Sequence, residues 1–169
     1  MNFVNIMNEL ILKNKINALM VKDLMDDIIE SAYPDFFATC DRMSSEIALS
    51  IDSMETEMLL NAIESIKGEV ERIFYREKLV VYPFIQTSIL NKQEINLSTL
   101  QKVDSEMNKV SKNIQNLIEK IQTFEMADQE KDSKSILIML SNMVNNSWQV
   151  LSSKRLRLNS SISSDITKK

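Results

Sequence analysis

Apolar residues recur at steps of three and four along most of this 169-residue chain. That period is typical of amphipathic α-helices, because residues three and four apart share one face of a helix. The repeat is most regular from Leu97 to Ile121, where it predicts one long helix with one buried face. The predicted stripe comprises Leu97, Leu100, Val103, Met107, Val110, Ile114, Leu117 and Ile121.

Similar stripes predict three further long helices, over residues 21–51, from about residue 54 to Tyr82, and from Ile136 to Leu158. Pro34 predicts a kink or a break just before it, and Pro83 predicts an end or a kink, because proline lacks an N–H and clashes with the preceding turn. Polar stretches at 86–96 and 127–133 predict connections between the helices.

These elements predict an all-α protein, an up-down-up-down four-helix bundle with an extra N-terminal helical segment. We divide it into an N-terminal helical segment (1–20), the bundle (21–158) and a disordered tail (159–169), which is rich in serine and lysine. An extended two-helix coiled coil is the alternative, but Pro34, Pro83 and the aromatic residues on the stripes argue against it.

The composition of the chain argues against several kinds of structure and function. There is one glycine, so few tight turns are available for strand hairpins. There is no histidine, which excludes Ser-His and Cys-His catalysis within the chain and removes the commonest transition-metal ligand. We therefore expect no enzyme activity and no cofactor. The net charge of −4 without a dense basic run argues against direct nucleic-acid binding. The single cysteine, Cys40, and the lack of a membrane-spanning apolar run favour a cytoplasmic protein.

Glu77 is an acidic residue on an apolar stripe, following Ile66, Val70 and Ile73 at helical spacing. It is either a buried carboxylate that anchors a ligand or an ordinary ion-paired group. In the second reading it pairs with Arg72, Arg76 or a lysine of a neighbouring helix, or it reaches water. Buried charges are normally paired, which favours the second reading. Residues 154–157 (KRLR) are interpreted as a basic patch that suits a helix C-terminus.

The segment Glu77-Lys78-Leu79-Val80-Val81-Tyr82-Pro83 resembles the end of the second helix in hemerythrin-like proteins. That family carries His-x-x-x-Glu followed by an apolar-aromatic-proline corner. The likeness is closest to the di-iron branch linked to repair of iron–sulfur centres, and it spans most of residues 24–158 as a pattern. The resemblance implies that Glu77 matches the family's ligand glutamate and that Ile73 stands at the paired histidine.

The resemblance also places other residues at the family's ligand positions. Tyr33 and Met54 stand at histidine positions, Met107 replaces the histidine of a Glu-His signature, and Trp148 and Ser152 replace a second His-x-x-x-Glu. One ligand of the set survives, so we expect a metal-free site filled by packed side chains. The predicted vestigial site, and possible ligand pocket, is lined by Tyr33, Met54, Ile73, Glu77, Met107, Trp148 and Ser152.

The sequence thus supports three hypotheses. The first is a degenerate, metal-free hemerythrin-like bundle that acts as a regulatory or protein-interaction module, with a protein partner or a second copy of itself. The second is a small-ligand sensor that uses a residual pocket lined by Tyr33, Glu77, Met107 and Trp148. The third is a di-iron hemerythrin-like protein of the oxygen or nitric-oxide stress response, which the missing ligands disfavour.

Overall fold

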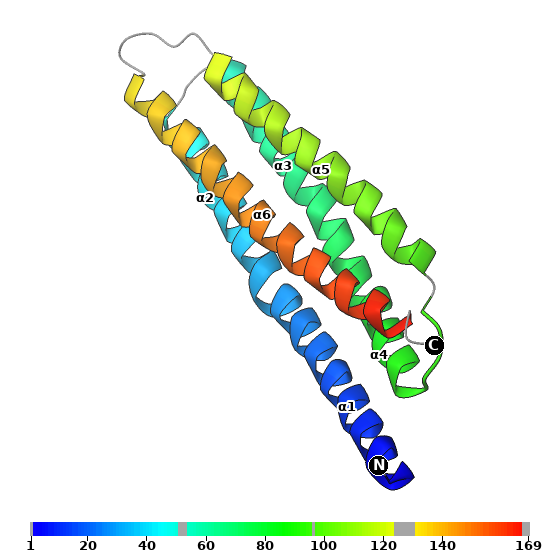
Figure 1. Cartoon of the computed structure of the whole chain (residues 1–169). Helices are drawn as coiled ribbons and strands as arrows, with labels where there is room; N and C mark the ends of the chain where they lie inside the picture. The colour runs from blue at the N-terminus through cyan, green and yellow to red at the C-terminus, as the bar shows by residue number, and fades with distance from the viewer. Residues whose placement is uncertain (1, 51–53, 96, 124–130, 167–169) are drawn as a thin grey trace.

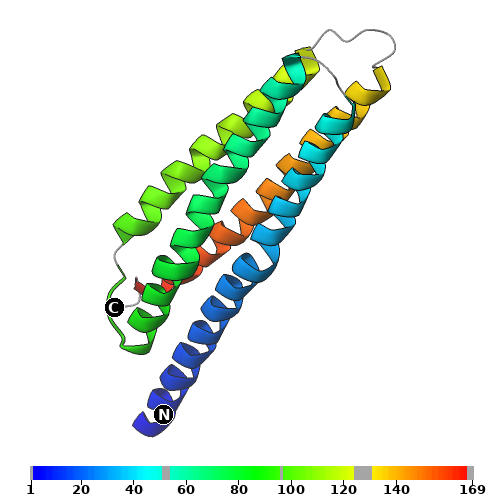
Figure 2. The same cartoon turned by 180° about the vertical axis from the view of Figure 1, so that it is seen from behind.

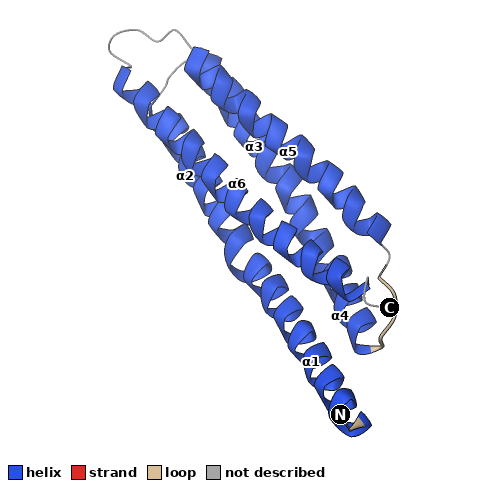
Figure 3. Ribbon diagram, viewed as in Figure 1, coloured by secondary structure: helices blue, strands red, loops and turns tan. Residues whose placement is uncertain are grey.

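The computed structural model describes residues 2–50, 54–95, 97–123 and 131–166. Within these ranges the chain is helical apart from short turns, and it contains no strand (Figure 3). None of the helices in these ranges is long and apolar enough to cross a membrane. The elements are α1 (Phe3–Asp27), η1 (Ile28–Ala32), α2 (Tyr33–Ser50), α3 (Met54–Arg76), η2 (Glu77–Val81), α4 (Tyr82–Leu90), α5 (Leu97–Thr123) and α6 (Lys131–Ile166).

Several of these elements join end to end into longer rods. The first rod, α1–η1–α2, runs from Phe3 to Ser50, and the second, α3–η2–α4, runs from Met54 to Leu90. The segments η1 and η2 are single π-helical turns in these rods. The helices α5 and α6 form two more rods without such a turn.

The rods lie side by side along a common direction (Figures 1 and 2). Helix α2 contacts α3 and α6, and α5 contacts the same two helices from the other side. Each rod therefore packs against the next rod in the chain, and the fourth packs back against the first. Helix α1 contacts α6 and, less closely, α4, and its N-terminal end projects beyond both (Figure 1).

The core follows the predicted stripes closely. The prediction for α5 is confirmed, because Leu100, Val103, Val110 and Ile121 are all buried. In α6 the buried face begins at Leu137, and Ile136, which we placed on the stripe, is 38% exposed. Further along the same face lie Leu140, Val144, Trp148 and Leu151, all buried.

The chain is helical over most of the predicted disordered tail. Helix α6 continues to Ile166, and Leu158 and Ile162 are each only 1% exposed. The prediction for 159–166 was wrong because Ile162 follows Leu158 by four residues and so stays on the buried face. Residues 167–169 lie outside the described part of the chain.

The predicted polar connection at 86–96 is also shorter than expected. Helix α4 continues to Leu90, because Ile85 and Ser88 are buried on its inner side. A turn follows in which Lys92 adopts a φ of 53°. The predicted connection at 127–133 ends at Lys131, where α6 begins, and 124–130 lie outside the described residues.

The boundary that we set at residue 20 falls inside α1, which continues without a break from Phe3 to Asp27. The change at this point is one of burial. Residues 2–9 are all exposed, whereas Val21 is the first buried core residue along α1 among the described side chains.

Candidate functional site

Two π-helical turns allow the first two rods to continue as helices past their prolines. Pro34 and Pro83 each lack a backbone N–H, and the ring of each would clash with the carbonyl four residues earlier in a regular helix. In the π-turns the N–H of Tyr33 bonds to the carbonyl of Ile28, and that of Tyr82 bonds to Glu77, five residues back. The extra residue in the turn relieves the clash, so both rods continue past proline.

Each π-turn is followed directly by a tyrosine and a proline, and both tyrosines hydrogen-bond to the same side chain. The Tyr33 hydroxyl donates to Oε2 of Glu77 at 2.7 Å, and the Tyr82 hydroxyl donates to the same oxygen at 2.8 Å. Glu77 is the first residue of the second π-turn and is 0% exposed. The two Tyr-Pro pairs thus bring the first and second rods together at one buried carboxylate.

The third partner of Glu77 comes from α6. The Arg155 Nε donates to Oε1 of Glu77 at 2.7 Å, and the arginine residue is only 5% exposed. Its Nη1 lies 3.3 Å from Oδ1 of Asp104 on α5, and Asn159 donates to both Asp104 oxygens, at 3.3 and 3.4 Å. All four rods therefore contribute to this group, which we call the Glu77 cluster: Tyr33, Glu77, Tyr82, Asp104, Arg155 and Asn159.

Burial and charge fix the protonation of the hydrogen-bond donors in the Glu77 cluster. Burial raises the pKa of Tyr33 and of Tyr82 well above the usual value, and the adjacent Glu77 carboxylate raises both further. Burial opposes the charge of Arg155, but Glu77 and the other acidic neighbours outweigh it and raise the pKa of the guanidinium. Both tyrosines stay neutral donors and Arg155 stays a cation.

The Glu77 cluster is saturated. Among the described residues, no buried side-chain nitrogen or oxygen lacks a hydrogen-bond partner. Both carboxylate oxygens of Glu77 accept strong hydrogen bonds, two from hydroxyls and one from a guanidinium. The arrangement holds the Glu77 carboxylate inside the protein with both of its oxygens already accepting hydrogen bonds from the chain's own side chains.

The sequence did not identify the cation that pairs with Glu77. We considered Arg72, Arg76 or a neighbouring lysine, but Arg76 instead pairs with Glu106 at 2.5 Å. Arg155 was assigned to a basic patch at a helix end, although α6 continues for eleven residues beyond it. The signal was its spacing, because Arg155 lies four residues after Leu151 and three before Leu158 on the buried stripe.

The other predicted site residues differ in burial and in their contacts. Ile73 and Met107 are buried in the core, and Ser152 is partly exposed. Trp148 is fully buried against Phe36, with ring centroids 5.4 Å apart, and its Nε1 donates to the Ser111 hydroxyl at 2.7 Å. The side chain of Met54 lies outside the described part. Of the predicted lining, Tyr33 and Glu77 are the pair that hydrogen-bond to each other.

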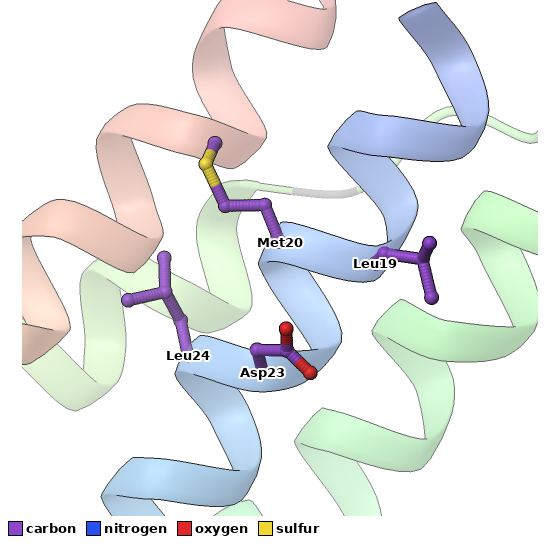
Figure 4. Close-up of a pocket in the computed structure, with 4 residues that line it drawn as sticks. All are labelled: Leu19, Met20, Asp23 and Leu24. Atoms are coloured by element: carbon purple, nitrogen blue, oxygen red, sulfur yellow. The ribbon is translucent and has the colours of Figure 1, made fainter. Parts of the chain in front are cut away.

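Two pockets open on the surface away from Glu77. One is a shallow concavity on α1 lined by Leu19, Met20, Asp23 and Leu24, which lie on adjacent turns of that helix (Figure 4). The other lies between α3 and α5 and is lined by Ala62, Ser65, Ile66, Asn113, Asn116, Leu117 and Lys120. In the described part of the chain, no three acidic, cysteine or histidine residues are grouped so that they could hold a metal ion.

The chain was compared with family models, with curated proteins and with solved structures, and none of them matches. The resemblance to hemerythrin-like proteins therefore depends on the residues quoted above.

Proposed function

We propose that the chain is a metal-free, hemerythrin-like up-down-up-down four-helix bundle that acts as a non-catalytic protein-interaction module. The ring of contacts from α2 to α3, α5 and α6 supports the bundle. The resemblance to the hemerythrin-like family supports a regulatory setting.

The loss of metal chemistry is supported by what surrounds the one surviving ligand-type residue. Two tyrosine hydroxyls and the Arg155 guanidinium occupy both oxygens of Glu77. A transition-metal centre needs several imidazole or carboxylate ligands on one ion, whereas Ile73, Met107 and Trp148 bring apolar surface to the core. The same observations disfavour the ligand-sensor hypothesis, because the predicted lining is packed and hydrogen-bonded.

The observation that carries the interaction role is the uncovered apolar surface of α1. Phe3, Val4, Ile6 and Met7 are all exposed in the part of α1 that projects beyond the other rods (Figure 1). Leu19 and Met20 are exposed on the same helix. Grouped apolar side chains on one exposed element mark a binding surface more often than single exposed ones do.

The proposed function is tested by affinity capture of the full chain after cross-linking in its own cells. The α1 variant Ile6→Asn/Met20→Asn removes apolar surface from the projecting helix. The matched control, Leu79→Asn/Val80→Asn, removes two apolar side chains that are also exposed, on η2. We expect the wild type and the η2 control to retain a protein partner, or a further copy of the chain, that the α1 variant loses. Capture of nothing by the wild type, or equal loss by both variants, would contradict the proposal.

A further inference from the structure

The polar groups of the Glu77 cluster divide into two sets according to the rod that carries them. The first three rods supply both carboxylates and both tyrosine hydroxyls, which belong to Tyr33, Glu77, Tyr82 and Asp104. Helix α6 supplies the groups that donate to those carboxylates, the guanidinium of Arg155 and the amide of Asn159. Three rods thus form an anionic site, and the fourth rod places a cation in it.

Groups other than Arg155 also hold the Glu77 carboxylate in place. Both tyrosine hydroxyls donate to its Oε2, at 2.7 and 2.8 Å, and leave Oε1 for the guanidinium. The ring of Tyr33 is itself packed, with its centroid 5.1 Å from that of Phe74 and 6.1 Å from that of Phe37. These contacts do not involve α6, so the first three rods orient the carboxylate by themselves.

The cation in this site is held through two different nitrogens. Nε of Arg155 donates to Oε1 of Glu77 at 2.7 Å, and Nη1 donates to Oδ1 of Asp104 at 3.3 Å. A planar guanidinium fixes the spacing and direction of these two donors, whereas the ammonium of lysine carries all of its donors on one atom. The geometry therefore favours a guanidinium group over an ammonium group.

Arg155 is also the buried polar link between the last part of α6 and the other rods. Helix α6 continues for eleven residues beyond it, and Leu158 and Ile162 in this part are each 1% exposed. The neighbouring Lys154 pairs with Asp27 of α1 at 2.7 Å, but both side chains are partly exposed. Ion pairs that reach water contribute little to stability, so the attachment of this part of α6 depends more on Arg155.

We propose that the first three rods form a guanidinium-binding site and that Arg155 fills it as an intramolecular ligand. The carboxylates of Glu77 and Asp104 are the acceptors, and the two tyrosine hydroxyls orient Glu77. The ligand class of the site is a monoalkylguanidinium cation, and its occupation by Arg155 fastens the last part of α6 to the bundle. The exposed surface of α1 takes no part in this site, so the site and the interaction role of α1 can be tested separately.

Chemical rescue of Arg155→Ala tests the site. Alanine keeps Cβ, and ethylguanidinium supplies the side-chain atoms that the variant lacks. A ligand that binds only the folded chain stabilises it, so we expect ethylguanidinium chloride to raise the Tm of Arg155→Ala and the effect to saturate. At about ten times its Kd, the ratio of folded to unfolded chain should rise about elevenfold. Circular dichroism follows unfolding, and if Arg155→Ala is already unfolded, the expected result is a return of the helical signal.

Matched controls separate binding in the site from a general effect of the salt. Propylammonium chloride at the same concentration supplies the atoms of a lysine side chain and should not rescue Arg155→Ala. The double variant Glu77→Gln/Arg155→Ala lacks the acceptor, and the wild type already holds its own guanidinium, so neither should respond to ethylguanidinium. Absence of rescue in Arg155→Ala overturns the proposal, and so does an equal effect of propylammonium or an equal response of either control chain.

Amide hydrogen exchange tests whether Arg155 fastens the end of α6. Arg155→Lys keeps the charge but replaces two spaced donors with one nitrogen. We expect the backbone amides of α6 after residue 155 to exchange about tenfold faster or more, because losing a charged hydrogen bond makes local opening easier. Arg157→Lys is the matched control, since Arg157 is exposed on the same helix, and it should exchange like the wild type. Exchange in Arg155→Lys as slow as in the wild type overturns this role of Arg155.

Discussion

The two ends of the first rod are built in opposite ways. Near Tyr33 the rod turns polar groups inward, and the charge of Glu77 is fully enclosed. Near Phe3 the same rod turns apolar groups outward, and these side chains are exposed among the residues that the structure describes. In the Glu77 cluster, every buried side-chain nitrogen or oxygen that the structure describes has a hydrogen-bond partner. The difference indicates that the Glu77 cluster holds the rods together, and it is the reason that we propose the projecting part of α1 as the binding surface.

Removing the cation of the Glu77 cluster should have the largest effect. Arg155→Ala leaves the Glu77 carboxylate buried with hydroxyl donors alone, which should lower the free energy of unfolding by about 3–5 kcal/mol. Urea unfolding followed by circular dichroism measures the loss. Arg157→Ala is the matched control, because Arg157 is exposed on the same helix and should change stability by less than about 0.5 kcal/mol. Equal effects of the two variants would show that the pair at Glu77 is not structural.

Removing one hydroxyl of the Glu77 cluster should cost less. Tyr82→Phe keeps the ring and deletes one hydrogen bond to a charged acceptor, so we expect a loss of about 1.5–3 kcal/mol. Tyr75→Phe serves as the control, since Tyr75 is exposed on α3. Chemical unfolding of both variants gives the difference, and a Tyr82→Phe variant as stable as the wild type would contradict the observed bond.

Alkaline pH should lower the free energy of unfolding through the two tyrosines of the Glu77 cluster. The folded-state pKa values of Tyr33 and Tyr82 lie above their unfolded values. Folding therefore retains protons that the unfolded chain loses, and stability is full below about pH 10 and falls as the pH rises beyond it. Each tyrosine contributes a slope of about 1.4 kcal/mol per pH unit.

The thiol of Cys40 adds to the same trend, because burial raises its pKa to about 12. Its contribution begins nearer pH 9 and is shared by all variants that keep Cys40. Unfolding measured between pH 8 and 11 should therefore show a shallower slope in Tyr82→Phe than in the wild type. Identical slopes would mean that Tyr82 does not sit beside a buried charge.

Changes at the projecting end of α1 should have the smallest effect on the stability of the monomer. Phe3→Ser removes a large apolar side chain that is mostly exposed, so we expect less than about 0.5 kcal/mol in the folded monomer. Thermal unfolding at a dilution where the chain is monomeric measures this. A loss comparable to that of Tyr82→Phe would show that Phe3 is packed against its own chain.

The sequence predicted the long-range order of the fold well because burial imposes a helical period. The stripe of α5 specified its bounds, since each step of three or four kept one face apolar from Leu100 to Ile121. The prediction from sequence failed in α6, where the same helical period continued through polar residues. Arg155 and Ile162 lie on the buried stripe of α6, but a charged residue and a serine-rich composition hid that continuity.

The Glu77 cluster was predicted only in part because its geometry depends on contacts between rods. The stripe of α3 indicated that Glu77 faces inward, and the first-helix pattern brought Tyr33 onto a neighbouring seam. Neither pattern showed that two π-turns would rotate Tyr33 and Tyr82 onto one carboxylate oxygen. The repeated Tyr-Pro pair, at 33–34 and 82–83, was the signal in the sequence that could have revealed this relation.

Metal analysis of the full chain tests the central claim most directly, because that claim makes Arg155 the cation that Glu77 holds. The protein is purified from iron-supplemented cells, and its iron and manganese are measured beside those of a Glu77→Gln variant. We predict background metal in both. Stoichiometric metal that is present in the wild type and lost in Glu77→Gln would contradict the account.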